Sequence, residues 1–142
     1  MIKIKNKRLL DANEDILVQQ VSASGTMRGI NDLEINRKYP RSHSEYNKIC
    51  KDNSYDYSKM KGKVDLTKES GKYIAKIFSQ DENGNTDYKA LRRGLRLLRK
   101  YAEQEKLSVA IPFKIGCEKG NWNDIIDIVN QEFKDYTVIL YK

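Results

Sequence analysis

A glycine-bearing loop between a predicted strand and a predicted helix is the part of the sequence best suited to chemistry. Residues 108–122 read Ser-Val-Ala-Ile-Pro-Phe-Lys-Ile-Gly-Cys-Glu-Lys-Gly-Asn-Trp. Gly116 and Gly120 allow the backbone of such a loop to turn so that N–H groups point at an anion, close to the first turn of the next helix. Alternatively, both glycines only make the strand-to-helix turn. The stretch predicts either a phosphate site or a plain connection.

A second loop of small residues follows the apolar residues 16–21. Residues 22–29 read Ser-Ala-Ser-Gly-Thr-Met-Arg-Gly. Ligands of parallel sheets bind beyond the carboxyl ends of the strands, so both loops are expected on one rim of the sheet. Ser22, Ser24 and Gly25 either line a ribose there or are ordinary turn residues.

The elements that position these loops alternate between strand and helix patterns. Leu91, Leu95 and Leu98 recur at helical spacing and predict the clearest helix, residues 87–106. Ile30, Leu33, Ile35 and Tyr39 fit a helix more loosely, which Pro40 ends. Strands are predicted at residues 2–4, 16–21, 64–66, 73–78, 109–113 and 137–140, and further helices at 30–39, 42–51 and after Asn121, the last with Trp122, Ile125, Ile126, Val129 and Phe133 facing inward. This order predicts an α/β sheet with helices on both faces.

Length and charge limit the classes of function. The 142 residues fit a single domain, 1–142, and the net charge of +7 favours an anionic partner. That partner is a nucleotide, a nucleic acid or an acidic protein surface, and charge alone does not choose among them. Five basic residues also share one face of the predicted helix 87–106, which we interpret as a solvated face; they are Arg92, Arg93, Arg96, Arg99 and Lys100.

Metal, disulfide and membrane chemistry are not expected. Cys50, Cys117 and the single His43 are too few and too far apart for a metal cluster or a disulfide framework. No apolar run approaches the roughly 20 residues that a membrane span needs. We therefore expect a soluble, cytoplasmic protein that uses neither a metal nor a cofactor and has no membrane partner.

Several stretches resemble the macrodomain family, the ADP-ribose-binding fold. The branch that contains the terminal ADP-ribose protein glycohydrolase and its bacterial and phage relatives is similar at residues 73–80, at residues 87–91, and at residues 111–117 followed by Trp122. The resemblance covers nearly the whole chain. It implies a three-layer αβα fold with a mixed central sheet flanked by helices, and a site for ADP-ribose or a related phosphorylated nucleotide.

The resemblance also implies roles for particular residues, and some of them depart from the family pattern. The backbone of Ile115, Gly116, Cys117 and Gly120 is implied near the diphosphate, and Tyr141 near the base. Lys7-Arg8 replaces the family's Gly-Asp, whose carboxylate accepts from the adenine amino group. Ser22 replaces an asparagine near the distal ribose, and the glycine-rich turn after Met27 reads Arg28-Gly29-Ile30-Asn31. Arg8 and Arg28 are either drift on an inactive site or donors for a further phosphate or a guanine edge.

Catalytic residues are the least certain part of the resemblance. Relatives that form a covalent intermediate need a lysine where this chain has Gln80, and an amide cannot supply that nucleophile. The partner carboxylate is expected near Glu118. Other relatives lack the lysine and act through their substrate, as ADP-ribosyl hydrolases or ADP-ribose 1''-phosphate phosphatases. We expect binding rather than turnover. The alternative function is an inactive macrodomain that binds a nucleic acid or a protein through its basic surface.

Overall fold

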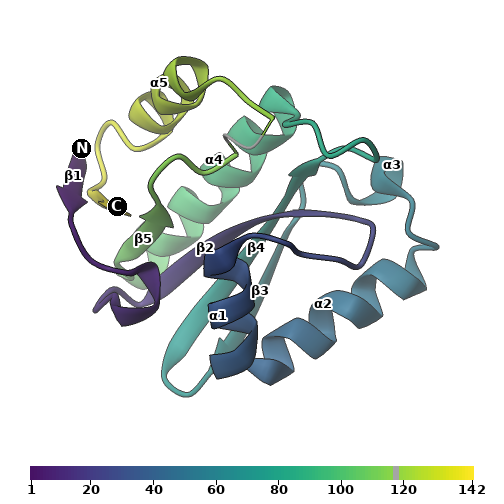
Figure 1. Ribbon diagram of the computed structural model, residues 1–142. Helices are drawn as coiled ribbons and strands as arrows, with labels where there is room; N and C mark the ends of the chain where they lie inside the picture. Colours follow the sequence, from purple (N-terminus) through teal and green to yellow (C-terminus); the bar gives the residue numbers. More distant parts are fainter. Residues whose placement is uncertain (117–118) are drawn as a thin grey trace.

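The fold is a six-stranded sheet between two layers of helices. The computed structural model describes residues 1–116 and 119–142. Its strands are β1 (Ile2–Lys5), β2 (Ile16–Ser22), β3 (Val64–Glu69), β4 (Lys72–Gln80), β5 (Val109–Pro112) and β6 (Val138–Tyr141). Its helices are α1 (Ile30–Lys38), α2 (Pro40–Asp52), α3 (Tyr57–Met60), α4 (Tyr88–Glu105) and α5 (Trp122–Glu132), with a 3-10 turn η1 at Leu9–Asp11. Figure 1 shows α1 and α2 on one side of the sheet and α4 and α5 on the other.

The sheet is mixed, as the resemblance implies. The strand order is β1-β6-β5-β2-β4-β3, in which neighbours are parallel except for β3, which runs antiparallel to β4. Because successive side chains of a strand point to opposite faces, β2 sends Ile16 and Val18 toward α4 and α5 and Leu17 toward α1. The buried parallel strands β2, β4 and β5 therefore end together at one rim.

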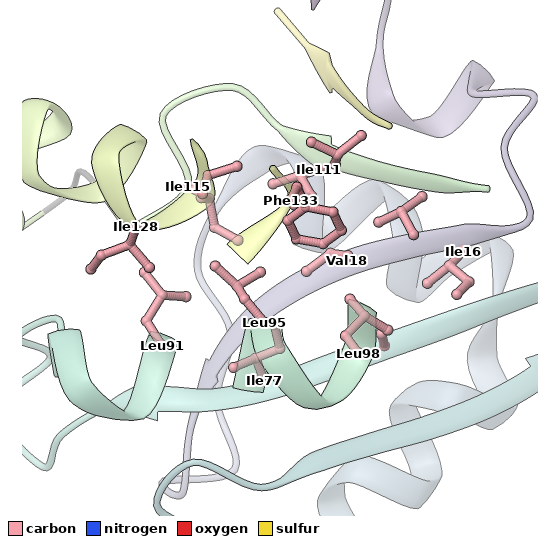
Figure 2. Packing of buried hydrophobic residues seen from close by; sticks show 14 of the residues in the cluster. Ile16, Val18, Ile77, Leu91, Leu95, Leu98, Ile111, Ile115, Ile128 and Phe133 are labelled. Carbon is pink, nitrogen blue, oxygen red and sulfur yellow. The ribbon is translucent and has the colours of Figure 1, made fainter. Parts of the chain in front are cut away.

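An apolar core fills the layer between the sheet and helices α4 and α5. Figure 2 shows Leu91, Leu95 and Leu98 of α4 against Ile16 and Val18 of β2, among other buried hydrophobic residues. Gly94 allows α4 to lie close to β4, because a Cβ atom at this position would be 2.4 Å from Cγ2 of Ile77. The spacing of the three leucines in the sequence predicts this packing, because it places them on one stripe of the helix.

The other face of the sheet buries polar groups. Lys76 of β4 is fully buried beneath α2. Its Nζ lies 3.1 Å from Oδ2 of Asp65 and donates to Oγ of Ser42 at 2.6 Å and to Oγ1 of Thr67 at 3.0 Å. Burial lowers the pKa of this lysine, and the carboxylate of Asp65 opposes that shift.

The predicted elements are all present, with corrections at their ends and on their faces. The helix predicted from residue 42 begins at Pro40, where a proline at the first helical position needs no hydrogen-bonded N–H. The short elements α3 and η1 were not predicted. Of the four residues predicted to form the stripe of α1, Ile35 and Tyr39 are buried, whereas Ile30 and Leu33 are 76% and 46% exposed.

The inward face of α5 also differs in part from the prediction. Asn121 caps the helix, and Ile125, Val129 and Phe133 are buried, whereas Trp122 and Ile126 are only half-buried. Among the residues that the structure describes, no helix is long and apolar enough to cross a membrane.

Candidate functional site

A cavity of about 730 Å³ lies where β2, β4 and β5 end. Its walls come from the segment that joins β2 to α1, from the hairpin after β4, and from the loop after β5. The lining residues of these walls are Gln20, Val21, Ser22, Ser24, Thr26, Met27, Arg28, Gly29, Ile30, Asn31 and Asp32, then Gln80, Asp81, Glu82, Asn83 and Gly84, and lastly Pro112, Phe113, Lys114, Ile115, Gly116 and Lys119. The two loops predicted to share a rim therefore line one cavity.

Hydroxyl groups order the loop after β2. The Oγ of Ser24 lies 2.7 Å from Oγ of Ser22 and 2.9 Å from Oγ1 of Thr26. The Tyr46 hydroxyl of α2 donates to the carbonyl oxygen of Ser22 at 2.7 Å, and burial raises the pKa of that tyrosine. Gly25 has φ +83°, a left-handed conformation that favours glycine. The loop thus presents a row of hydroxyl groups on a fixed backbone.

The loop after β5 is fixed from below by two buried side chains. Oγ1 of Thr86 donates to the carbonyl oxygen of Gly116 at 2.7 Å, and Nε2 of Gln20 donates to the same Oγ1 at 3.3 Å. Gly116 has φ +75°, and a Cβ atom there would lie 3.1 Å from the Thr86 hydroxyl. A Cβ atom at Gly120 would lie 2.5 Å from the carbonyl oxygen of Gly116. Both glycines are therefore required by packing within the protein, whatever the cavity holds.

The hairpin after β4 is tied to the same loop. The carboxylate of Asp81 accepts from the backbone N–H groups of Asn83 and Asn85, each at 2.9 Å, which closes the turn. Nζ of Lys119 donates to the carbonyl oxygen of Asn83 at 2.8 Å. Together with the bond from Thr86, this contact joins two walls of the cavity.

Charges of both signs face the cavity. Arg28 and Lys114 are exposed cations on opposite walls, and Lys119 is committed to Asn83. On the acidic side, Asp81 is committed to its own turn, and Oδ1 of Asp32 accepts from Nε2 of Gln19 at 3.1 Å. Glu82, also exposed, lines the same cavity. Arg28 and Lys114 favour an anionic ligand, and the carboxylate of Glu82 opposes one.

The structure brings together seven of the residues singled out from the sequence. Lining the cavity are Ser22, Ser24, Arg28, Gly29, Gln80, Ile115 and Gly116. Gly25 and Gly120 belong to the same loops without lining the cavity. Cys117 and Glu118 lie outside the described residues.

Two further candidates lie elsewhere. Arg8 is paired with Asp11 at 3.0 Å and with Glu34 at 3.5 Å, and it is not among the lining residues. Tyr141 is buried, and its hydroxyl donates to the carboxylate of Glu14. Burial raises the pKa of Tyr141 to about 12. Neither side chain reaches the cavity in this arrangement.

Sequence reasoning missed Gln20, Thr86 and Tyr46, which hold the walls in place. The alternation of β2 contains a signal for Gln20, because it lies on the same face as Ile16 and Val18 and must find a polar partner when buried. Thr86 carries no such signal. Within the described part of the chain, no group of His, Cys, Asp and Glu residues is arranged to hold a metal ion.

Comparison with known proteins identifies the fold. No protein-family model and no curated protein matches the sequence. Among solved structures, the chain is similar to the macrodomain of Mycobacterium tuberculosis DarG, with a TM-score of 0.83 and 24% identity over 100% of this chain and 98% of that one. The macrodomain of Thermus aquaticus DarG has a TM-score of 0.81 and 19% identity over the same shares, 100% and 98%.

A third structure contains a ligand. Thermosipho africanus DarTG, solved in complex with ADP-ribose, has a TM-score of 0.79 and 16% identity over 99% of this chain and 41% of that one. These TM-scores, over 99% to 100% of this chain, show that the chain has the macrodomain fold.

Proposed function

We propose that the cavity binds ADP-ribose or a closely related nucleotide diphosphate. The observation that carries the proposal is the position of the cavity, at the carboxyl ends of β2, β4 and β5 in a macrodomain fold. A protein of the same fold, DarTG of Thermosipho africanus, was solved with ADP-ribose bound. A volume of about 730 Å³ also lies within the range of sites that bury a nucleotide-sized ligand.

The walls offer donors suited to a diphosphate and a ribose. Gly29 is the N-cap of α1 and has no side-chain cap, and residues 29–32 line the cavity, so the N-terminus of that helix lies at this wall. Gly116 and Ile115 bring the backbone of the second loop to the opposite wall. Ser22 and Ser24 supply hydroxyl groups for a sugar. These four residues, Gly29 and the exposed cation Arg28 form the binding set that we propose, with Gly25 and Gly120 shaping the loops.

Binding without hydrolysis is the activity we propose. Gln80 lines the cavity where its covalent-type relatives need an amine, and an amide is neither a nucleophile nor a base. The carboxylate of Asp81 is committed to backbone donors. The protein should therefore release negligible ADP-ribose from a substrate protein that carries it on glutamate. Chromatography of free ADP-ribose measures this release. Rapid release would show that Glu82 or the substrate itself supplies the base.

Calorimetric titration with ADP-ribose tests the binding site. Arg28→Glu should weaken binding by roughly tenfold or more, because it places a carboxylate beside the diphosphate. Arg37→Glu is the matched control, since Arg37 is exposed at the far end of α1 and does not line the cavity. Equal affinity for the two variants would move the site elsewhere.

The base specificity forms a separate test. Because Arg8 is paired with Asp11 and Glu34, we expect Arg8→Ala to leave the affinity for ADP-ribose nearly unchanged. A tenfold loss toward a guanine-containing analogue alone would instead assign Arg8 to a guanine edge.

A further inference from the structure

The outer edge of β3 offers backbone groups to another strand. β3 is the last strand of the sheet and pairs with β4 on one side only. Tyr73, opposite Lys68, directs its N–H to Asp15 on the far side, and alternate residues of an antiparallel pair point their N–H and C=O groups the same way. The backbone groups of Val64, Leu66 and Lys68 therefore face outward, and the Lys68 carbonyl oxygen accepts from Arg41 there.

Because successive side chains of β3 point to opposite faces, its acidic and basic side chains lie on different sides of the strand. Asp65 is paired with the buried Lys76, and the carboxylate of Glu69 accepts from the backbone N–H groups of Arg41 and Ser42 at the start of α2. Both acidic side chains of β3 are thus committed on the α2 side. Lys61, Lys63, Lys68, and Arg93 of α4, whose side chain covers Gly62, are exposed basic residues on and beside the edge. The half-buried carboxylate of Glu45 on α2 accepts from Oγ1 of Thr67 and is committed on the α2 side as well.

A hollow of about 200 Å³ opens at the beginning of the same strand. Its walls are mainly apolar, from Ile49, Met60, Val64 and Phe78, and Lys63 lies at its border. The volume suits one large apolar side chain. The carboxylate of Asp65 also lines the hollow, so an acidic side chain is disfavoured inside it. No residue of the hollow lines the large cavity.

We propose that the edge of β3 binds an extended acidic peptide of a partner protein by strand addition. The main chain of the peptide pairs with the outward N–H and C=O groups of Val64 and Leu66 and with the outward N–H of Lys68, whose carbonyl oxygen accepts from Arg41. One apolar side chain of the peptide enters the hollow on the α2 side. Its acidic neighbours point to the opposite face of the added strand, beside Lys68 and Arg93. In this mode, main-chain hydrogen bonds supply affinity, and the pocket and charges supply specificity.

Two other occupants fit the edge less well. A second copy of this chain would set Lys61, Lys63 and Lys68 against the same lysines, and like charges opposed across strands are unfavourable. A nucleic acid strand needs open aromatic rings for stacking. The ring of Tyr73 is covered, with Nζ of Lys68 5.5 Å from its centroid and the Tyr101 ring at 6.4 Å.

Titration of the ¹⁵N-labelled protein with a synthetic peptide of alternating leucine and glutamate tests the proposal. Amide shifts are expected at Val64, Leu66 and Lys68 and around the hollow, and not at Ser24 or Gly116. A peptide with lysine in place of glutamate is the probe control and should not bind. Shifts confined to the large cavity, or no shifts, would overturn the proposal and leave the proposed nucleotide site untouched.

Paired variants separate strand addition from general attraction. Lys68→Glu with Arg93→Glu should weaken binding of the acidic peptide roughly tenfold, whereas Lys3→Glu with Lys134→Glu changes the net charge equally at exposed sites elsewhere, including the other edge strand β1. Lys68→Pro removes an outward N–H and should abolish binding, and Lys68→Ala should retain most of it. Equal losses in both charge pairs, or displacement of the peptide by oligothymidylate at the same residues, would refute the proposal.

Discussion

Both faces of the sheet are covered by helices and carry fully buried side chains, but they are stabilised in different ways. Against α4 and α5, the contacts are almost entirely apolar, as with Leu95, which is 0% exposed. Against α1 and α2, Lys76 is also 0% exposed and depends on Asp65, Ser42 and Thr67 for partners. The first face gains stability in proportion to area, whereas the second is stable only when every polar partner is in place.

The polar face also carries the wall of the cavity that joins β2 to α1. Gln19 reaches from β2 to Asp32 of α1, and Tyr46 of α2 holds the carbonyl oxygen of Ser22. Directional bonds of this kind fix positions more narrowly than apolar contacts do. The comparison therefore indicates that the α4 and α5 face supplies most of the stability, and that the α1 and α2 face supplies much of the geometry of the site.

The largest effect is expected at Lys76. Lys76→Met should lower the free energy of unfolding by about 3 to 4 kcal/mol, because it leaves the half-buried carboxylate of Asp65, and the hydroxyl groups of Ser42 and Thr67, without their cation. Urea unfolding measures this loss. Adding Asp65→Leu should recover at least half of it, since two apolar groups replace the pair. If the double variant is no more stable than Lys76→Met, the pair is not what the substitution disrupts.

A smaller loss is expected on the apolar face. Leu95→Ala should cost about 3 kcal/mol from lost burial and the cavity that remains. Leu95→Met, which keeps the volume, should cost less than about 1.5 kcal/mol. Urea unfolding again provides the measurement. A cost for Leu95→Ala above that for Lys76→Met would contradict the expectation that losing one partner of the buried polar group costs more than truncating one apolar side chain.

The apolar face was predictable from sequence, and the polar face was not. The spacing of Leu91, Leu95 and Leu98 reports burial directly, because one stripe of a helix faces one surface. Lys76 in a strand reads as solvent-facing, and its burial depends on Ser42, which is 34 residues away in sequence. Ionic and hydroxyl partners of this kind leave no periodic pattern.

The site divides in the same way. Ser22 and Gly116 follow apolar runs and could be placed at strand ends, so both line the cavity as expected. Thr86 could not be found, because its bond to Gly116 spans 30 residues and depends on the hairpin that precedes α4. Arg8 and Tyr141 were singled out through the resemblance alone, which carries no information about the carboxylates that now pair with them.

An ion pair at the border of the apolar face gives a pH-dependent test. The carboxylate of Glu132 on α5 accepts from Arg96 and Arg92 of α4, and the bonds from Arg96 lower its pKa most. Because the pKa of Glu132 is lower in the folded protein, the ion pair contributes its full stability above the pKa that glutamate has in the unfolded chain. That contribution is lost as the pH falls through the pKa of the folded protein. Glu132→Gln should cost roughly 1.5–3 kcal/mol at neutral pH and less in acid. Unfolding measured across pH 2–7 checks this, and equal costs at both ends would exclude the ion pair as the cause.

The smallest change in stability is expected at Thr86. This residue joins Gln20 of the sheet to the cavity loop at Gly116, so its substitution should also affect ligand binding. Thr86→Val keeps the shape and removes the hydroxyl that donates to Gly116 and accepts from Gln20, so the free energy of unfolding should fall by about 1 kcal/mol. Because the loop after β5 then loses its fixed position, affinity for ADP-ribose should fall roughly fivefold in calorimetry. Thr137→Val, at an exposed threonine before β6, is the matched control and should change neither quantity. If stability falls while affinity is unchanged, Thr86 serves only to close the strand-to-helix turn, and the loop at Gly116 does not hold the ligand.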